Sequence, residues 1–283
     1  TSWYSKAFCV SGTHGKTTTS TLLAHILETS PEGCSAFLGG ISNNYGTNFL
    51  LNSNDVVVVE ADEFDRSFLQ LHPQIAAITA MDADHLDIYG DLEHVQQAYR
   101  EFAGQVSDCL VAKYGLPLDP ADFKARIYTY STTDSRADFH AENLRLSSDG
   151  HYTFDLVHPD GVLRDINVGT LGILNVENSI AAAAVALLHG TSEEAVREAI
   201  GTFKGVKRRM EEHVNKPGLT YIDDYAHHPA ELAASIRTIK EIFPGRNVCA
   251  VFQPHLFTRT RDFAKEFAEA LSLADEAVLL DIY

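Results

Sequence analysis

The residues best suited to chemistry form one glycine-rich stretch between an apolar run over residues 7–10 and a helix-like segment over residues 19–27. They are Gly12, Thr13, His14, Gly15, Lys16, Thr17 and Thr18. A buried strand that turns through glycines into a helix start directs backbone N–H groups and the positive end of the helix dipole to one point, which suits a phosphate chain. The stretch therefore predicts a nucleotide-binding loop. In it, Lys16 faces the outer phosphates and Thr17 offers a hydroxyl to Mg²⁺.

The loop departs from the usual phosphate-loop pattern at its first glycine. That pattern has a glycine five residues before Gly15, where this sequence has Val10, and the first glycine here is Gly12. An ordinary glycine turn between a strand and a helix is the alternative interpretation. The Gly-Lys-Thr triplet and the strand before it favour nucleotide binding.

Acidic residues follow a second buried strand, which the β-branched run over residues 55–60 predicts. Ligands of open parallel sheets lie beyond the carboxyl ends of the strands, so we expect Glu60 to be a second Mg²⁺ ligand. For Asp62, Glu63 and Asp65 a solvated acidic turn is an equally good interpretation.

A histidine follows the third buried strand, which is predicted over residues 75–79. A lone histidine is more often a surface or structural group than a ligand. His85, however, lies among aspartates beyond a strand end, as Glu60 does. His85 is therefore a candidate for the same site.

Two asparagines stand at the start of an alanine-rich helix that is predicted to run to about Leu188. Asn175 and Asn178 are three residues apart, so they share one face of its first turn. Helix capping is one interpretation and suits Asn175. Recognition of a base edge by the two amides is the other.

The elements that must position these residues alternate between strands and helices, which predicts an α/β fold with a mostly parallel sheet. Short alternating stretches over residues 137–168 predict added antiparallel hairpins. A domain boundary is expected near residues 205–210. Beyond it, a second parallel α/β domain is predicted, with strands over residues 220–223, 248–252 and 276–281 and helices over residues 229–242 and 263–273.

Polar clusters also follow the strands of this second domain, over residues 223–229 and 253–261. They would line the crevice of such a sheet. The adjacent His227 and His228 raise a transition-metal site as an alternative. It is disfavoured because adjacent side chains point in different directions.

Composition narrows the classes of function. The 283 residues are 45% apolar and 22% charged, which is typical of globular proteins and enough for two domains. A net charge of −17 argues against a nucleic-acid surface. No membrane span or signal peptide is recognisable, so a cytoplasmic location is expected. Scattered cysteines without metal-ligand spacing predict reduced, buried thiols, and a chain that opens and closes on strands predicts a fragment of a longer protein.

Taken in order, these motifs resemble those of the Mur ligases, and the resemblance spans nearly the whole chain. It rests on residues 12–18, Glu60-Ala61-Asp62-Glu63, Asp84-His85-Leu86-Asp87, Asn175 with Asn178, Arg208-Arg209, residues 223–229 and residues 252–261. The family has one domain for the UDP-sugar, a central ATPase domain and a C-terminal Rossmann-like domain. The resemblance implies that residues 1–206 form the P-loop-type central domain. Residues 207–283 would form the first part of a truncated Rossmann-like domain.

Within this family the chain looks most like the alanine-adding members. The resemblance implies an ATP- and Mg²⁺-dependent ligase that joins the lactyl carboxylate of UDP-N-acetylmuramate to L-alanine in peptidoglycan precursor synthesis, through an acyl phosphate. Such chemistry requires an in-line phosphoryl donor and cations around the crowded oxygens. No nucleic-acid or membrane partner is expected, and the residues leave the oligomeric state open.

The resemblance also assigns roles to residues. In the first domain, Lys16 would contact the outer phosphates, Thr17 and Glu60 would hold one Mg²⁺, and His85 would help to hold a second. The adenine would be read by Asn175 and Asn178. In the second domain, the phosphates would meet Arg209, the ribose would meet Asp224, and the incoming substrates would meet Tyr225, His227 and Arg259. A site divided in this way implies domain closure.

The sequence departs from the family pattern at two leucines. Leu174 stands where many alanine-adding members have a histidine, and Leu256 where an arginine is often found. Two rival functions also remain. A recycling ligase that attaches a tripeptide to the same UDP-sugar would have a longer segment after Glu63 than the brief stretch 64–68. A nucleotide-driven switch would not need the polar clusters of the second domain.

Overall fold

The computed structural model describes residue 1, residues 3–82 and residues 89–283. The chain divides into two compact units. The first unit comprises Thr1–Arg145, Thr153–Gly169 and Leu174–Lys207, and the second comprises Leu146–Tyr152, Thr170–Ile173 and Arg208–Tyr283. The domain boundary expected after residue 206 stays a prediction.

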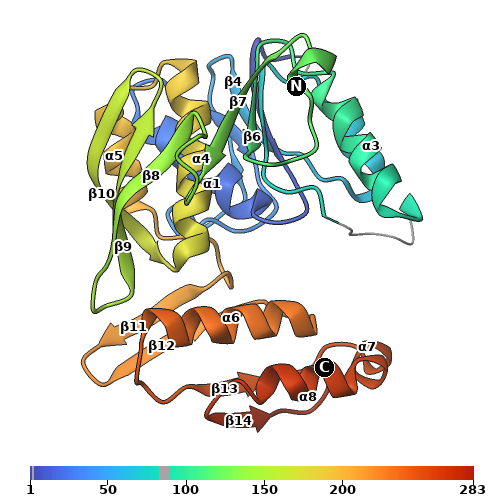
Figure 1. Cartoon of the computed structure of the whole chain (residues 1–283), viewed down its shortest axis with the longest axis vertical. Helices are drawn as coiled ribbons and strands as arrows, with labels where there is room; N and C mark the ends of the chain where they lie inside the picture. The colour runs from blue at the N-terminus through green and yellow to red at the C-terminus, as the bar shows by residue number, and fades with distance from the viewer. Residues whose placement is uncertain (2, 83–88) are drawn as a thin grey trace. The chain divides into compact units, whose positions relative to one another are not determined.

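A ten-stranded, mostly parallel sheet organises the first unit, in the order β10-β9-β8-β7-β6-β5-β1-β4-β2-β3 (Figure 1). Its strands are β1 Lys6–Ser11, β2 Ser35–Phe37, β3 Phe49–Leu50, β4 Val56–Glu60, β5 Ile75–Ile78, β6 Cys109–Lys113, β7 Arg126–Ser131, β8 Phe139–Leu146, β9 His151–His158 and β10 Gly161–Leu171. Parallel pairing extends from β2 through β4, β1, β5, β6 and β7 to β8. The predicted α/β class is confirmed.

The central strands are buried because helices cover both faces of the sheet. These helices are α1 Lys16–Thr29, α3 Leu92–Ala103, α4 Ile173–His189 and α5 Glu193–Thr202. On one face, the Phe8 ring lies 4.8 Å from the ring of His189 in α4. On the other face, Cys9 belongs to the apolar cluster beneath α3. Neighbouring residues of β1 thus face opposite layers, as the pleat of a strand requires.

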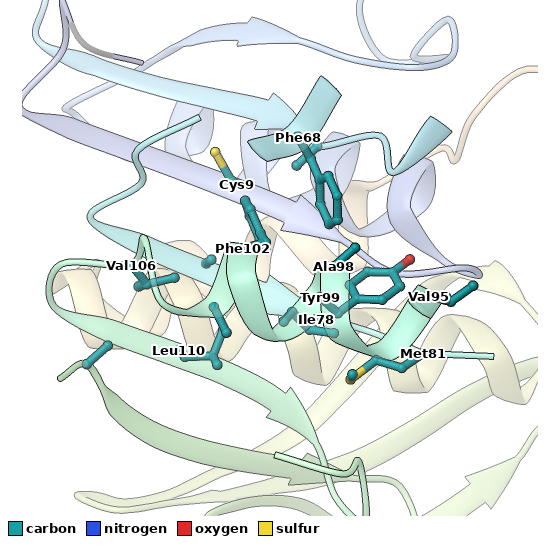
Figure 2. Close-up of a cluster of buried hydrophobic side chains, with 14 of the residues drawn as sticks. Cys9, Phe68, Ile78, Met81, Val95, Ala98, Tyr99, Phe102, Val106 and Leu110 are labelled. Atoms are coloured by element: carbon teal, nitrogen blue, oxygen red, sulfur yellow. The ribbon is translucent and has the colours of Figure 1, made fainter. Parts of the chain in front are cut away.

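The cluster beneath α3 also anchors a 3₁₀ helix, η1 Phe64–Gln70, that follows β4. Phe68 of η1 stacks on Phe102 at 5.1 Å and meets Tyr99 edge-on at 5.4 Å. Figure 2 shows these rings packed together. Because Phe68 is fully buried, the acidic segment just before it is held against the sheet.

The added hairpins follow β7. Strands β8, β9 and β10 are consecutive in the chain and adjacent in the sheet, and short turns join them. Such short connections require antiparallel neighbours, so the predicted hairpins are confirmed. A second short 3₁₀ helix, η2, covers Pro120–Asp122.

The second unit contains two separate two-stranded sheets and three helices. These elements are β11 Glu211–Lys216, β12 Leu219–Asp223, α6 Pro229–Ile242, β13 Cys249–Phe252, α7 Phe257–Asp262, α8 Ala264–Leu271 and β14 Glu276–Leu279. β13 and β14 pair in parallel, as predicted. β12 instead pairs antiparallel with β11, a strand that the sequence analysis did not find.

The cysteines differ from one another in exposure. Cys9 and Cys34 are buried, as predicted, and burial raises the pKa of Cys9 to about 12 and that of Cys34 still further. Cys249 is exposed, so the prediction of a buried thiol is wrong there. None of the helices within the described ranges combines the length and apolar character that a membrane crossing needs.

Candidate active site

The sheet order brings three predicted segments to one edge. β1 lies between β4 and β5, with Val10 opposite Glu60 on one side and Ser11 opposite Ile78 on the other. All three strands run in the same direction, so their carboxyl ends open at the same place. The glycine-rich loop, the acidic segment after β4 and the residues after β5 therefore meet there.

The loop has a backbone that only glycine adopts easily. Gly12 has a φ of 134°, and a Cβ on it would lie 2.2 Å from Thr79 Oγ1 and 2.7 Å from the backbone nitrogen of Ala80. Val10, by contrast, is a buried residue of β1. The first glycine of the usual pattern is therefore not needed at that position, because the turn begins later.

Gly15 caps the start of α1. Its φ is 82°, no side chain among the described residues caps the helix, and the first turn carries no acidic residue. The N–H groups and the dipole of α1 are therefore not neutralised by a carboxylate of that turn. This end of the helix suits an anion.

Lys16 lies back across the loop and pairs with a carboxylate. Its Nζ donates to the carbonyl of Gly12 at 2.9 Å and to Glu63 Oε1 at 2.9 Å, and it lies 2.7 Å from Glu63 Oε2. Glu63 is only 1% exposed. The alternative of a solvated turn is therefore wrong for Glu63, whereas Asp62 and Asp65 are exposed.

Thr17 and Glu60 come together as the sequence predicted for a metal site. Thr17 Oγ1 donates to Glu60 Oε1 at 2.9 Å. The other carboxylate oxygen accepts from Ser20 Oγ at 3.4 Å and from the Gly39 backbone N–H at 2.6 Å. A hydroxyl and a carboxylate are oxygen donors of the kind that Mg²⁺ prefers, so these residues fit that ion.

The other loop residues have different surroundings. Thr13 is buried, and its hydroxyl accepts from the backbone N–H of Asp82 at 3.2 Å. His14 is exposed, with Nε2 3.7 Å from an Asp82 carboxylate oxygen, and Thr18 is half-buried. His85, the candidate for a second metal, lies outside the described residues.

The predicted asparagines lie against the loop. Thr19 Oγ1 donates to Asn178 Oδ1 at 3.2 Å, and Asn178 Nδ2 donates to Asn175 Oδ1 at 3.1 Å. A Cβ on Gly15 would lie 2.8 Å from Asn178 Oδ1. Helix α4 already begins at Ile173, so the capping alternative is wrong for Asn175. Leu174, between Ile173 and Asn175, is 58% exposed.

A pocket adjoins Glu60 on the β2–β3 side. It is lined by Phe37, Leu38, Gly39, Asn48, Phe49, Glu60 and Asp62. The rings of Phe37 and Phe49 lie 5.3 Å apart, and both are partly exposed. A ligand in this pocket would touch aromatic rings and the predicted metal ligand at once.

Within the second unit, two of the three predicted substrate residues, Tyr225 and His227, lie side by side. The Arg208 guanidinium lies 4.9 Å from the Tyr225 ring, and the His227 ring lies 5.0 Å from it. Asp224 is held in place, because it accepts from the Met210 backbone N–H at 3.0 Å and from the Ser235 hydroxyl. Arg209 is exposed, and Arg259 lies in the short helix α7.

The metal-site alternative at the paired histidines fails on geometry. His227 Nδ1 lies 3.0 Å from the Tyr225 carbonyl oxygen, whereas His228 is the N-cap residue of α6 and its ring contacts that of Phe263. The two rings therefore have different partners.

Three potential ligands do gather on the β11–β12 hairpin, namely Glu211, His213 and Asp223. Arg208 already contacts both carboxylates. Its backbone N–H donates to Glu211 Oε2 at 2.7 Å, and its side-chain Nε lies 3.9 Å from Asp223 Oδ2. We therefore assign this group a structural role.

Sequence reasoning missed Thr79 and left Glu63 open. Thr79 Oγ1 donates to the carbonyls of Ser11 and His14, so it joins β5 to the loop. Its place as the one polar residue at the end of the strand predicted over residues 75–79 was the available signal. The sequence around Glu63 does not distinguish it from Asp62 or Asp65. The packing of η1 against the core determines which of the three carboxylates faces Lys16.

Comparisons with known proteins agree with this geometry. Residues 10–186 match the family model described as the Mur ligase middle domain, and residues 208–282 match the Mur ligase, glutamate ligase domain. The chain is 49% identical to a UDP-N-acetylmuramate--L-alanine ligase from Parabacteroides distasonis, over 99% of this chain and 61% of that protein. A protein of the same name from Porphyromonas gingivalis is also 49% identical, over 98% of this chain and 62% of that protein.

A solved structure supports the fold along the same length. The crystal structure of a UDP-N-acetylmuramate-alanine ligase from Thermotoga maritima matches with a TM-score of 0.80 at 29% identity, and the match covers 98% of this chain and 62% of that one. The chain thus spans about three-fifths of the length of the relatives it matches.

Proposed function

This chain belongs to the Mur ligase family, and we propose that it is the catalytic part of an ATP-dependent ligase that adds L-alanine to the lactyl carboxylate of UDP-N-acetylmuramate. Such a ligase acts in peptidoglycan precursor synthesis, and we place it in the cytoplasm. ATP, Mg²⁺, the UDP-sugar and L-alanine are its proposed ligands. The two alanine ligases at 49% identity support this amino acid over others.

One observation carries the proposal: a glycine loop, a lysine and a hydroxyl–carboxylate pair meet at the ends of three adjacent parallel strands. Each part serves a step of phosphoryl transfer. The loop and the start of α1 bind phosphate oxygens, and Lys16 stabilises the charge that develops on them. Thr17 and Glu60 would hold Mg²⁺, which would neutralise negative charge on the phosphate oxygens.

The proposed reaction has two steps. A carboxylate oxygen of the UDP-sugar attacks the terminal phosphorus of ATP, and ADP leaves. The amine of alanine then attacks the carbonyl carbon of the acyl phosphate, loses a proton and expels inorganic phosphate. The protein's main task is to hold the reactants in line, because phosphoryl transfer depends mostly on positioning and electrostatic stabilisation.

The roles of the remaining predicted residues belong to the same proposal. Asn175 and Asn178 read the adenine. Arg209 and Asp224 contact the nucleotide, and Tyr225, His227 and Arg259 contact the incoming substrates. His85 is proposed for a second metal.

An omission assay tests the function on the protein extended to the length of its relatives. Without hydroxylamine, continuous ADP release should require UDP-N-acetylmuramate and L-alanine together. When alanine is omitted and hydroxylamine is added, the acyl phosphate should be trapped as a hydroxamate. A tripeptide in place of alanine tests the recycling ligase. Turnover with the tripeptide but not with alanine would support that rival, and ADP release without either substrate would support a nucleotide-driven switch.

A further inference from the structure

The loop lysine is paired with a buried acid that no step of the proposed reaction uses. Lys16 Nζ lies within 2.9 Å of both Glu63 carboxylate oxygens. The Glu63 side chain is 2% exposed and that of Lys16 is 14% exposed. Separating such a pair would leave a buried carboxylate without a counter-charge, which is strongly unfavourable. Lys16 therefore keeps Glu63 as its partner when a ligand arrives.

The backbone holds Glu63 in this position. Its carbonyl accepts from the Tyr89 hydroxyl at 2.6 Å and from the Arg66 backbone N–H at 3.0 Å. The buried residues Ala61 and Phe68 anchor the segment on either side. The carboxylate thus cannot follow Lys16 away from the sheet.

The pair still leaves Lys16 able to reach a ligand. An ammonium has three N–H bonds, and those to Gly12 and Glu63 use two of them. The third can meet a phosphate oxygen. What the pair removes is net charge, because a paired lysine no longer offers an uncompensated positive charge to an anion.

The charges around the loop are therefore unfavourable to a free polyphosphate. Among the described side chains that meet there, Lys16 is balanced by Glu63, and Glu60 adds a negative charge beside Thr17. Asp82 adds another near His14. Backbone N–H groups alone must then attract the anion, unless a cation comes with it.

We propose that Glu63 is a positioning residue that neutralises Lys16, so that the loop selects the Mg²⁺ complex of a nucleoside triphosphate over the free nucleotide. This inference rests on the proposed nucleotide-binding function. It adds a residue that determines which form of the nucleotide, metal-bound or free, the loop prefers. Free nucleotide carries more negative charge than its Mg²⁺ complex, so it is repelled more strongly by Glu60 and Glu63. Removing the charge of Glu63 relaxes this preference.

The test compares nucleotide affinity with and without metal in this chain. A non-hydrolysable ATP analogue, with an imido group between the β- and γ-phosphorus atoms, is titrated by calorimetry in excess Mg²⁺ and then in EDTA. The quantity of interest is the ratio of the dissociation constant in EDTA to that in Mg²⁺. Three proteins are compared: the wild type, Glu63→Gln, and Asp65→Asn as a control that removes an exposed charge from the same segment.

The proposal predicts that Glu63→Gln lowers this ratio by about tenfold or more, mainly because the free nucleotide binds more tightly. Asp65→Asn should leave the ratio within about twofold, since exposed charges are well screened. A Glu63→Gln protein that melts like the wild type but keeps the wild-type ratio overturns the proposal. Equal weakening in both buffers also overturns it, because that is the result of a purely structural role.

Two further outcomes of this titration are a Glu63→Gln variant that does not fold and a wild type that does not bind the analogue. If Glu63→Gln does not fold, Glu63→Met fills the same space without charge and carries the same predictions. If the wild type binds the analogue in neither buffer, the proposed function itself fails. Binding by the wild type with the same ratio of dissociation constants in Glu63→Gln would instead contradict only the role of Glu63.

Discussion

A hydroxyl and a carboxylate from different elements meet at Thr17 and Glu60. Thr17 is 6% exposed in the first turn of α1, and Glu60 ends β4. Their 2.9 Å hydrogen bond joins the loop helix to the neighbouring strand and sets two oxygen atoms side by side. Either residue alone would be ordinary, and their distance makes them a candidate Mg²⁺ site.

Replacing the Thr17 hydroxyl tests that assignment. Thr17→Val keeps the buried shape but removes one metal ligand, so we expect the Mg²⁺ enhancement of nucleotide affinity to fall by about tenfold or more. Thr17→Ser retains the hydroxyl and should stay within about threefold of wild type. Calorimetric titration in Mg²⁺ and in EDTA measures both. Equal enhancement in the valine and serine variants would remove Thr17 from the metal site.

Single residues were predictable where local spacing carries the signal. Lys16 and Thr17 follow Gly15 in a fixed pattern, and Glu60 abuts a β-branched run. Glu63 was not predictable, because its burial depends on Phe68 entering the core and on Asp65 and Arg66 adopting positive φ angles. Those features depend on tertiary packing, which the apolar periodicity of the sequence does not show.

At the scale of elements, the site depends on a close approach between the loop and the end of β5. Gly12 lies against Thr79 and Ala80, and the Thr13 backbone N–H donates to the Ala80 carbonyl at 3.3 Å. Three strands converge here because β1 is central in the sheet. The loop geometry is therefore a property of β1 and β5 together.

A methyl group at Gly12 should separate these elements. Gly12→Ala must place Cβ 2.2 Å from Thr79 Oγ1 at a φ of 134°, so we expect it to lower the free energy of unfolding by at least about 2 kcal/mol and to abolish nucleotide binding. Gly115→Ala is the control, because Gly115 has a φ of 89° but no atom of a described residue within 4 Å of its Cβ position. It should cost only about 1 kcal/mol. Urea unfolding measures both, and equal costs would contradict the predicted clash.

A buried histidine joins α1 to two other segments of the first unit. His25 is 7% exposed, with Nδ1 2.7 Å from the Tyr45 hydroxyl and Nε2 3.0 Å from Thr202 Oγ1. Burial lowers the pKa of His25 to about 4. It is therefore neutral at pH 7, and its two ring nitrogens link α1 to the segments that carry Tyr45 and Thr202.

This pKa predicts how stability depends on pH. Below about pH 6.5 the unfolded chain binds a proton at His25 that the folded chain does not take up until about pH 4. The stabilising contribution is thus complete above pH 6.5 and decreases as the pH falls toward 4, by about 3 kcal/mol in all. Urea unfolding between pH 7.5 and pH 5 should show this slope, and His25→Gln should reduce it. His72→Gln, which changes an exposed histidine, should keep it. A wild-type slope in His25→Gln would refute the assignment.

Elements were predictable where apolar periodicity was strong. The helix predicted over residues 229–242 is α6, and the strand predicted over residues 75–79 is β5 with one residue fewer. β11 was missed because Glu211–Lys216 is almost entirely polar and partly exposed. It forms through pairing with β12, a tertiary effect that its own sequence does not show.

For the whole molecule, the family assignment rests on both units. The middle-domain match covers residues 10–186 and the ligase-domain match covers residues 208–282, while the chain represents about three-fifths of its relatives' length. Among the described residues, the glycine-rich loop, Lys16 and the Thr17–Glu60 pair all lie in the first unit. Binding of the nucleotide's phosphates is therefore the part of the proposed activity that is simplest to test.

The most direct measurement titrates the Mg²⁺ complex of the imido ATP analogue into two variants that differ only at Lys16. Lys16→Met alone would leave Glu63 as an unpaired buried charge, at a cost of about 3 kcal/mol, so a loss of binding could reflect unfolding. Glu63→Gln is therefore compared with the double variant Lys16→Met/Glu63→Gln. We expect saturable one-to-one binding by Glu63→Gln and an affinity at least about 100-fold lower for the double variant, with similar melting temperatures. Equal affinities would show that Lys16 does not contact the phosphates and would contradict the assignment of this loop.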